Sequence, residues 1–220
     1  MSGLAQTGAA AGSVSIRLMC GSDAKAIAQM HIDRIGQGFL CSFPLRTLTS
    51  IYRAVAHVPS AFGFVAEANG RCEGFIACAT DLGRLYRNVL WRRGLSLLLR
   101  LLPAVFNRGM IRRVFETLGY PRKARHMQLP AAEVLSLATS EAFAGRGLGS
   151  LLMHAALSEF RRRGCVQVKV LVGGDLGPAN RFYVKQGFRL TGAIEHHGVA
   201  ENIYVIDLSN EATRHMAAGG

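Results

Sequence analysis

Acidic residues are scarce in this chain of 220 residues, because 14 Asp and Glu stand against 26 Lys and Arg. The formal net charge is +12 and the sequence pI is about 10.3. This excess of positive charge predicts an anionic partner: a nucleic acid, a membrane surface or an anionic ligand. Half of the residues are hydrophobic. That content excludes a mainly disordered chain and fits one α/β domain.

Cysteine pairs are also lacking. The five cysteines form no C-x-x-C motif and their number is odd, so the sequence predicts no zinc site, no other metal site and no disulfide framework. A reducing cytoplasm is the expected location. The first twelve residues lack the basic start and apolar core of a signal peptide. Residues 1–12 and 211–220 are predicted to be flexible tails around one domain, 13–210.

No long apolar run is free of charge. The leucine-rich stretch 85–106 contains four arginines, each of which costs roughly 2.5–3.5 kcal/mol at the centre of a bilayer, so a spanning helix is excluded. Residues 84–125 hold ten Arg and one Lys against only Glu116, a net charge of +10. We predict that 84–128 is a basic helical insert. It could lie on an anionic membrane, which would make the protein peripheral to that surface, or dock on its own domain. Nucleic acid is disfavoured, since no zinc-finger or RNP-like motif accompanies the charge.

Apolar periodicity predicts alternating strands and helices, with a hairpin at the turn Asn69-Gly70. The expected strands are 14–18, 61–68, 74–80, 133–139, 166–172, 188–194 and 202–208. The expected helices are 22–35, 43–58, 149–163 and 178–186, with the basic insert between the third and fourth strands.

The most informative stretch is a strand that runs into a glycine-rich turn and then a helix, EVLSLATSEAFAGRGLGSLLMHAAL. Glycines allow close backbone approach, and a helix start offers free N–H groups to an anion such as phosphate. The turn is not a Walker A loop, because no Lys follows it. It is also not a dinucleotide-binding turn, because Leu152 stands where the last glycine is needed.

Two motifs resemble the GNAT superfamily of acyl-CoA-dependent N-acetyltransferases. Gly147-x-Gly149 occupies the glycines of the signature [Q/R]-x-x-G-x-[G/A]. About thirty residues later, GPANRFYVKQGFRLTG looks like the second signature, A-x-x-x-Y-x-x-x-G-F. Ala144 departs from the Gln/Arg position and Leu176 from a frequent Asn. The resemblance implies an α/β fold with a GNAT-like mixed, mostly antiparallel twisted sheet flanked by helices.

The resemblance also implies site residues. The pantetheine arm would pair with the strand backbone at Leu137–Thr139, and Asn180 would meet the same arm. Tyr183 takes the position of the general acid, and Glu133 matches a catalytic Glu of histone-acetylating members. The residues implied to bind the cofactor are Leu137, Ala138, Thr139, Gly145, Arg146, Gly147, Leu148, Gly149, Ser150 and Asn180. His31, His196 and His197 are alternative bases; Tyr183 and Glu133 also have purely structural interpretations.

The implied function is transfer of an acetyl or short acyl group from acetyl-CoA (CoA) to a primary amine by direct attack. An anionic, lipid-linked or nucleotide-linked amino sugar is one acceptor that fits the charge, and other small amines or a protein amine stay open. The alternative is a non-catalytic module that binds acyl-CoA or an anionic membrane. Other expected partners are a small-molecule amine, an anionic membrane surface at 84–125 and, as an open option, a second copy of the chain in a homodimer.

Overall fold

The computed structural model describes residues 14–36, 39–88, 119–120, 124, 127–196 and 199–209. Within them, seven strands form one sheet in the order β1-β2-β3-β4-β5-β7-β6. Neighbouring strands are antiparallel except β4 and β5, which are parallel. The predicted mixed, mostly antiparallel sheet is confirmed. The strands are β1 (Ser15–Leu18), β2 (Ala61–Ala68), β3 (Arg71–Ala79), β4 (Ala132–Thr139), β5 (Gln167–Gly173), β6 (Arg189–His196) and β7 (Val199–Asp207).

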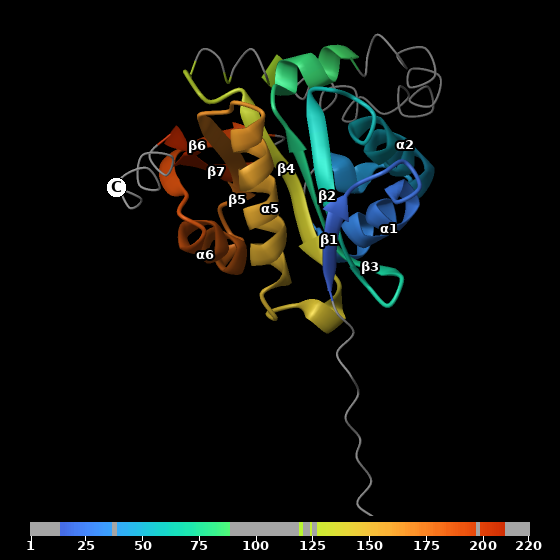
Figure 1. Ribbon diagram of the computed structural model, residues 1–220. Helices are drawn as coiled ribbons and strands as arrows, with labels where there is room; N and C mark the ends of the chain where they lie inside the picture. The colour runs from blue at the N-terminus through green and yellow to red at the C-terminus, as the bar shows by residue number, and fades with distance from the viewer. Residues whose placement is uncertain are drawn as a thin grey trace, which may run out of the picture.

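Helices cover both faces of the sheet (Figure 1). The first pair, α1 (Ala24–Arg34) and α2 (Leu45–Val55), lies on one face, and α5 (Leu148–Arg162) and α6 (Gly177–Lys185) lie on the other. Single 3₁₀ turns form η1 (Phe39–Ser42) and η2 (Glu141–Phe143). The second helix is shorter than the predicted 43–58, because it begins only after Pro44, whose backbone is extended.

Each face has its own apolar core. On the first face, Tyr52 of α2 meets Phe75 of β3 edge to face, with ring centroids 5.4 Å apart. On the second, Phe160 of α5 meets Phe62 of β2 at 4.9 Å. Such aromatic pairs add about 0.5–1.5 kcal/mol beyond burial alone. The middle of the sheet is therefore packed between the two cores. It includes β4, the strand that leads into the glycine turn.

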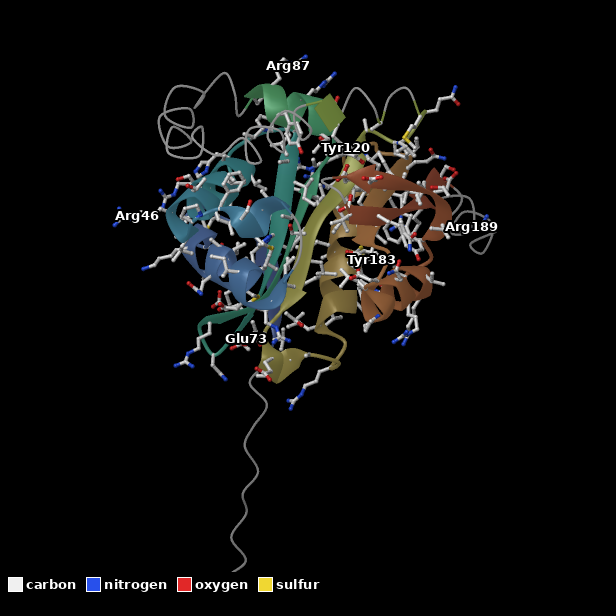
Figure 2. The ribbon with its side chains drawn as sticks, turned by 180° about the vertical axis from the view of Figure 1, so that it is seen from behind. Arg46, Glu73, Arg87, Tyr120, Tyr183 and Arg189 are labelled. Carbon is white, nitrogen blue, oxygen red and sulfur yellow. The ribbon has the colours of Figure 1, made fainter. Side chains whose placement is uncertain are left out.

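Most of the predicted basic insert lies outside the described residues, so its helical structure stays a prediction. At its start, residues 82–88 are helical, and Leu85 packs into the core on the side of α1 and α2. Tyr120 packs into the same core. Arg87 is exposed and projects from the end of the molecule (Figure 2). The predicted tails also lie outside the described residues. None of the helices in the described ranges has both the length and the apolar character needed to cross a membrane.

Candidate functional site

The glycine turn between β4 and α5 is the candidate anion site. Gly145 and Gly147 have φ angles of +73° and +82°, a backbone region that glycine adopts far more easily than other residues. A Cβ built on either glycine would point into open space. Gly147 directly precedes α5 and accepts the first amide hydrogen bonds of that helix, from Ser150 and Leu151.

Several amides of this turn are available to a ligand. No hydrogen bond of the described backbone uses the N–H groups of Gly145, Gly147, Leu148 or Gly149. The first amides of a helix have no partner within it, and the helix dipole adds positive charge there. The Arg146 side chain is exposed beside them, and Ser150 accepts a hydrogen bond of 3.0 Å from Gln186 of α6. This arrangement fits a diphosphate.

Next to the turn, β4 has a free edge. β4 pairs with β5 only at three positions, the last being Val134 with Val170, although β4 continues to Thr139. On its other side, β4 stays paired with β3 as far as Thr139. Leu137, Ala138 and Thr139, the residues predicted to meet the pantetheine arm, therefore present an edge without a strand partner in the described part of the chain. An extended ligand can add to such an edge as a strand does.

Tyr183 of α6 belongs to the apolar core on the side of α5, against which Leu137 of β4 also packs. Its ring stacks on Tyr204 and meets Phe188 edge to face, and Figure 2 shows it near the middle of the molecule. Burial raises the pKa of the phenol above its ordinary value of 10, with a smaller contribution from Cys78. The hydroxyl therefore stays protonated at neutral pH and can donate. Among the described residues, no hydrogen bond occupies it.

Glu133 lies at the other end of β4, in a buried ion pair that the sequence analysis missed. Its carboxylate is 3.0 Å from the ammonium of Lys169 on β5, and Lys169 is fully buried. The same ammonium donates to the carbonyl of Pro130 at 2.5 Å and lies 5.9 Å from the centre of the Tyr120 ring. The only sequence signal was a lysine between two valines in the strand β5.

Asn180 is fully occupied by the fold. Its Nδ2 donates to the carbonyls of Gly173 and Leu176 at 2.9 and 2.8 Å. Its Oδ1 accepts from Asn202 and Tyr204, both at 2.9 Å. A side-chain amide has two donors and one oxygen with two lone pairs, so none is left for a ligand. Asn180 thus joins α6 to β5 and β7, and this use favours positioning over direct contact with the cofactor.

Of the three histidines proposed as alternative bases, the structure describes the side chain of one. His31 is buried at 3% exposure, and its Nδ1 lies 2.6 Å from the hydroxyl of Tyr52. Burial lowers its pKa to about 4, so the ring is neutral at pH 7. The side chains of His196 and His197 lie outside the described residues. No three His, Cys, Asp or Glu side chains gather as a metal site in the described ranges.

An open groove of about 510 Å³ lies beside the turn, between α1 and η2. Its walls combine apolar, amide and charged side chains. They are Ala26, Gln29, Met30, Asp33, Arg34, Ser140 and Glu141. Arg34 and Glu141 approach each other across it at 3.9 Å. The groove extends the surface around the glycine turn onto α1.

Solved structures share this fold. The ribosomal-protein-S18-alanine N-acetyltransferase of Escherichia coli has a TM-score of 0.57 and 12% identity, with 90% of this chain and 95% of that one covered. Mutant forms of the spermidine/spermine N-acetyltransferase SpeG of Vibrio cholerae have a TM-score of 0.57 and 15% identity, with 91% and 97% covered.

A third structure is the paia N-acetyltransferase of Thermoplasma acidophilum in complex with coenzyme A, with a TM-score of 0.52, 14% identity and coverage of 89% and 99%. No curated protein matches the chain in sequence. The Acetyltransferase (GNAT) family, whose members take the acyl group from acetyl-CoA, matches residues 32–188. The chain therefore belongs to the GNAT acetyltransferase family.

Proposed function

We propose that the protein transfers an acetyl or short acyl group from CoA to a primary amine by direct attack. The single observation that carries the proposal is the row of unused amides at Gly145 and Gly147–Gly149, next to the free edge of β4. Bound acetyl-CoA supplies the activated thioester. The turn binds the diphosphate, with Arg146 and Ser150 beside it, and the backbone of Leu137–Thr139 aligns the extended arm.

Tyr183 acts as the general acid in this proposal. Its phenol gives a proton to the sulfur as the carbon–sulfur bond breaks, which prevents a free thiolate from attacking the product. Because burial raises the pKa of the phenol, the group is protonated at neutral pH and has a proton to give.

We also propose that Glu133 faces the acceptor amine. Its ion pair with Lys169 bears on how it acts there. The carboxylate of Glu133 is paired with the ammonium of Lys169 at 3.0 Å. In this proposal the carboxylate stabilises positive charge at the acceptor nitrogen. If Glu133 is instead the base, Glu133→Gln abolishes turnover while acetyl-CoA binding stays unchanged.

We propose a polar, anionic amine as the acceptor, such as a lipid-linked or nucleotide-linked amino sugar. The groove beside the turn supports a polar acceptor, since Gln29, Asp33 and Arg34 offer donors and acceptors. The basic segment 84–125 supports an anionic one. Contact of that segment with an anionic membrane, a cytoplasmic location and a homodimer also remain proposals. Co-sedimentation with anionic vesicles tests the membrane contact, and light scattering tests the homodimer.

A thiol-release assay with intact-mass analysis tests the function. Acetyl-CoA is offered with a panel of amino sugars, amino acids and polyamines, and at least one amine should gain an acetyl group as free thiol appears. A non-catalytic module, the alternative function, would bind acetyl-CoA in calorimetry and release no thiol with any amine. That outcome would overturn the proposal.

A further inference from the structure

Two tyrosine rings lie face to face in the apolar core on the side of α5 and α6. The ring of Tyr204 on β7 is stacked on that of Tyr183, with centroids 6.5 Å apart and planes inclined by 26°. This separation lies within the range of about 4.5–7 Å that is typical of aromatic pairs. The other rings that meet Tyr183, those of Phe182 and Phe188, are its near neighbours in sequence. In the described part of the chain, Tyr204 is therefore the ring contact between Tyr183 and a strand of the sheet.

The strand register places this pair of rings near the opening between β4 and β5. Tyr204 is opposite Val170 of β5, and Val170 is opposite Val134 of β4 in the last pair before the opening. Residues directly opposite each other project from the same face of a sheet. All three side chains belong to the core on the side of α5 and α6. Tyr204 thus lies one strand away from the opening, level with the point where it begins, and Tyr183 packs on it from α6.

The hydroxyl groups of the two tyrosines are used differently. The hydroxyl of Tyr204 donates to Oδ1 of Asn180 at 2.9 Å, and Asn202 donates to the same oxygen. The proton of Tyr204 is therefore engaged inside the fold. Nothing among the described residues accepts a proton from the hydroxyl of Tyr183. Of the two stacked phenols, Tyr183 is thus the one that can donate to a ligand.

Asn180 connects the hydroxyl of Tyr204 to the helix that carries Tyr183. Asn180 and Tyr183 both lie on α6, and residues three positions apart are neighbours on a helix surface. The amide of Asn180 also donates to the carbonyls of Gly173 and Leu176 at 2.9 and 2.8 Å, which ties α6 to the end of β5. Tyr204 therefore holds α6 through its hydroxyl and the phenol of Tyr183 through its ring.

We propose that Tyr204 is a positioning residue that, together with Asn180, sets the place of the phenol of Tyr183. The inference rests on the proposed transferase function, in which Tyr183 is the general acid. A general acid must lie within hydrogen-bond distance of the atom that receives its proton, here the sulfur of the leaving thiol. A displacement of about 1 Å can slow a reaction by about 10²-fold. Tyr204 acts through Tyr183, and Tyr183 remains the catalytic residue.

The test uses Tyr204→Phe in the full chain, with the amine that gives the highest wild-type turnover in the thiol-release panel. The change keeps the stacked ring and removes only the hydroxyl that holds Asn180. We expect kcat to fall by about tenfold, less than for a displacement of about 1 Å, because the ring contact remains. The KM for acetyl-CoA should stay unchanged, since the glycine turn and the β4 edge are proposed to bind it. A higher KM with unchanged kcat would overturn the proposal.

The same change in a Tyr183→Phe background separates positioning from a structural role. If Tyr204 acts through the acid, Tyr204→Phe should cause no further loss of kcat once the acid is absent, because the two effects are not additive. An equal loss in both backgrounds means a structural role and overturns the proposal. Asn180→Ala is the second variant, and it should also lower kcat. Adding Tyr204→Phe to it should have no further effect, since both changes remove the same hydrogen bond.

Thr191→Val is the matched control. Thr191 of β6 donates to the carbonyl of Ile203, the residue before Tyr204, at 3.1 Å. This change also removes a hydroxyl that holds β7, but beside a residue whose side chain packs on the other face of the sheet. Its kcat should equal that of the wild type, and a tenfold loss in this control would overturn the specific role of Tyr204.

The outcomes also separate this inference from the proposed function. If the wild type releases no thiol with any amine, or if Tyr183→Phe keeps the wild-type kcat, the proposed function fails and the positioning role fails with it. A slower Tyr183→Phe beside an unchanged Tyr204→Phe overturns the positioning role alone.

Discussion

The ammonium of Lys169 lies 3.0 Å from the carboxylate of Glu133, at the middle one of the three positions where β4 and β5 are paired. Lys169 is fully buried and Glu133 is 8% exposed, so neither charge is solvated by bulk water. The pairing of the two strands ends one position further on, at Val134 and Val170. The two charges therefore neutralise each other where β4 and β5 are still paired. The opening between the two strands, which the proposal assigns to the thioester arm, begins next to this pair.

Removing one partner of this pair should be more damaging than removing both. Lys169→Met leaves a buried carboxylate without its cation, and the free energy of unfolding should fall by about 3–5 kcal/mol. The double variant Lys169→Met/Glu133→Leu removes both charges and should recover most of this loss. Urea denaturation measures all three proteins. A single variant as stable as the wild type would mean that water solvates the pair.

Gly147 should be needed for cofactor binding, and not only because it permits the positive φ angle of the turn. Gly147→Ala places a methyl group beside the unused amides, so acetyl-CoA affinity should drop at least about tenfold, since 1.4 kcal/mol is a factor of ten in binding. Calorimetry measures this affinity. Gly164→Ala is the matched control, because Gly164 also has a positive φ, +76°, and open space around it, at the opposite end of α5. Equal affinity in the two variants would place the diphosphate elsewhere.

Local patterns predicted the elements that depend on local chemistry. Asn69 and Gly70 form the predicted hairpin turn with φ angles of 51° and 72°, and Gly145 and Gly147 form the predicted glycine turn. What the sequence could not show depends on distant partners. Lys169 is buried only because Glu133 and Pro130 meet it from another part of the chain. β4 also bulges at Leu135, which its register with β3 leaves unpaired, and no local pattern specifies that register.

Two residues of the candidate site also show that a local motif does not predict contacts with distant parts of the chain. The motif identified Tyr183, whose role as general acid stays a prediction. It also identified Asn180, but not that Gly173, Leu176 and β7 use every hydrogen-bonding group of this side chain. A motif gives residue types at a spacing, whereas the hydrogen bonds of a buried amide depend on the folded chain.

Tyr183→Phe should slow turnover without weakening acetyl-CoA binding. The change keeps the contacts with Phe188 and Tyr204 and removes only the proton donor, so kcat should fall toward the lower end of the roughly 10²–10⁴-fold range of general-acid catalysis. Because burial raises the pKa of Tyr183, the wild-type rate should show no loss from phenol ionisation between pH 8 and about 10. A variant with wild-type kcat would make Tyr183 a packing residue only.

His31 should make the protein less stable in mild acid. Burial lowers its pKa from 6.5 to about 4 in the folded state, so the unfolded chain binds this proton more readily. The contribution of the neutral ring to stability is therefore full above pH 6.5. It declines as the pH falls toward about 4 and reaches a loss of up to about 3 kcal/mol.

Two other groups lose stability in a lower window, because the pKa values of Asp23 and Glu159 are held at about 2 by Arg17 and Arg162. Their ion pairs contribute fully above their ordinary pKa values of 3.8 and 4.5 and are lost as the pH falls toward 2.

His31→Gln should thus flatten the dependence of unfolding free energy on pH between 6.5 and about 4.5 and leave the steeper loss below that range. Urea denaturation at a series of pH values measures both windows. His57→Gln, an exposed histidine change, should leave the whole curve in place, and an unaltered slope in His31→Gln would show that another group causes the acid sensitivity.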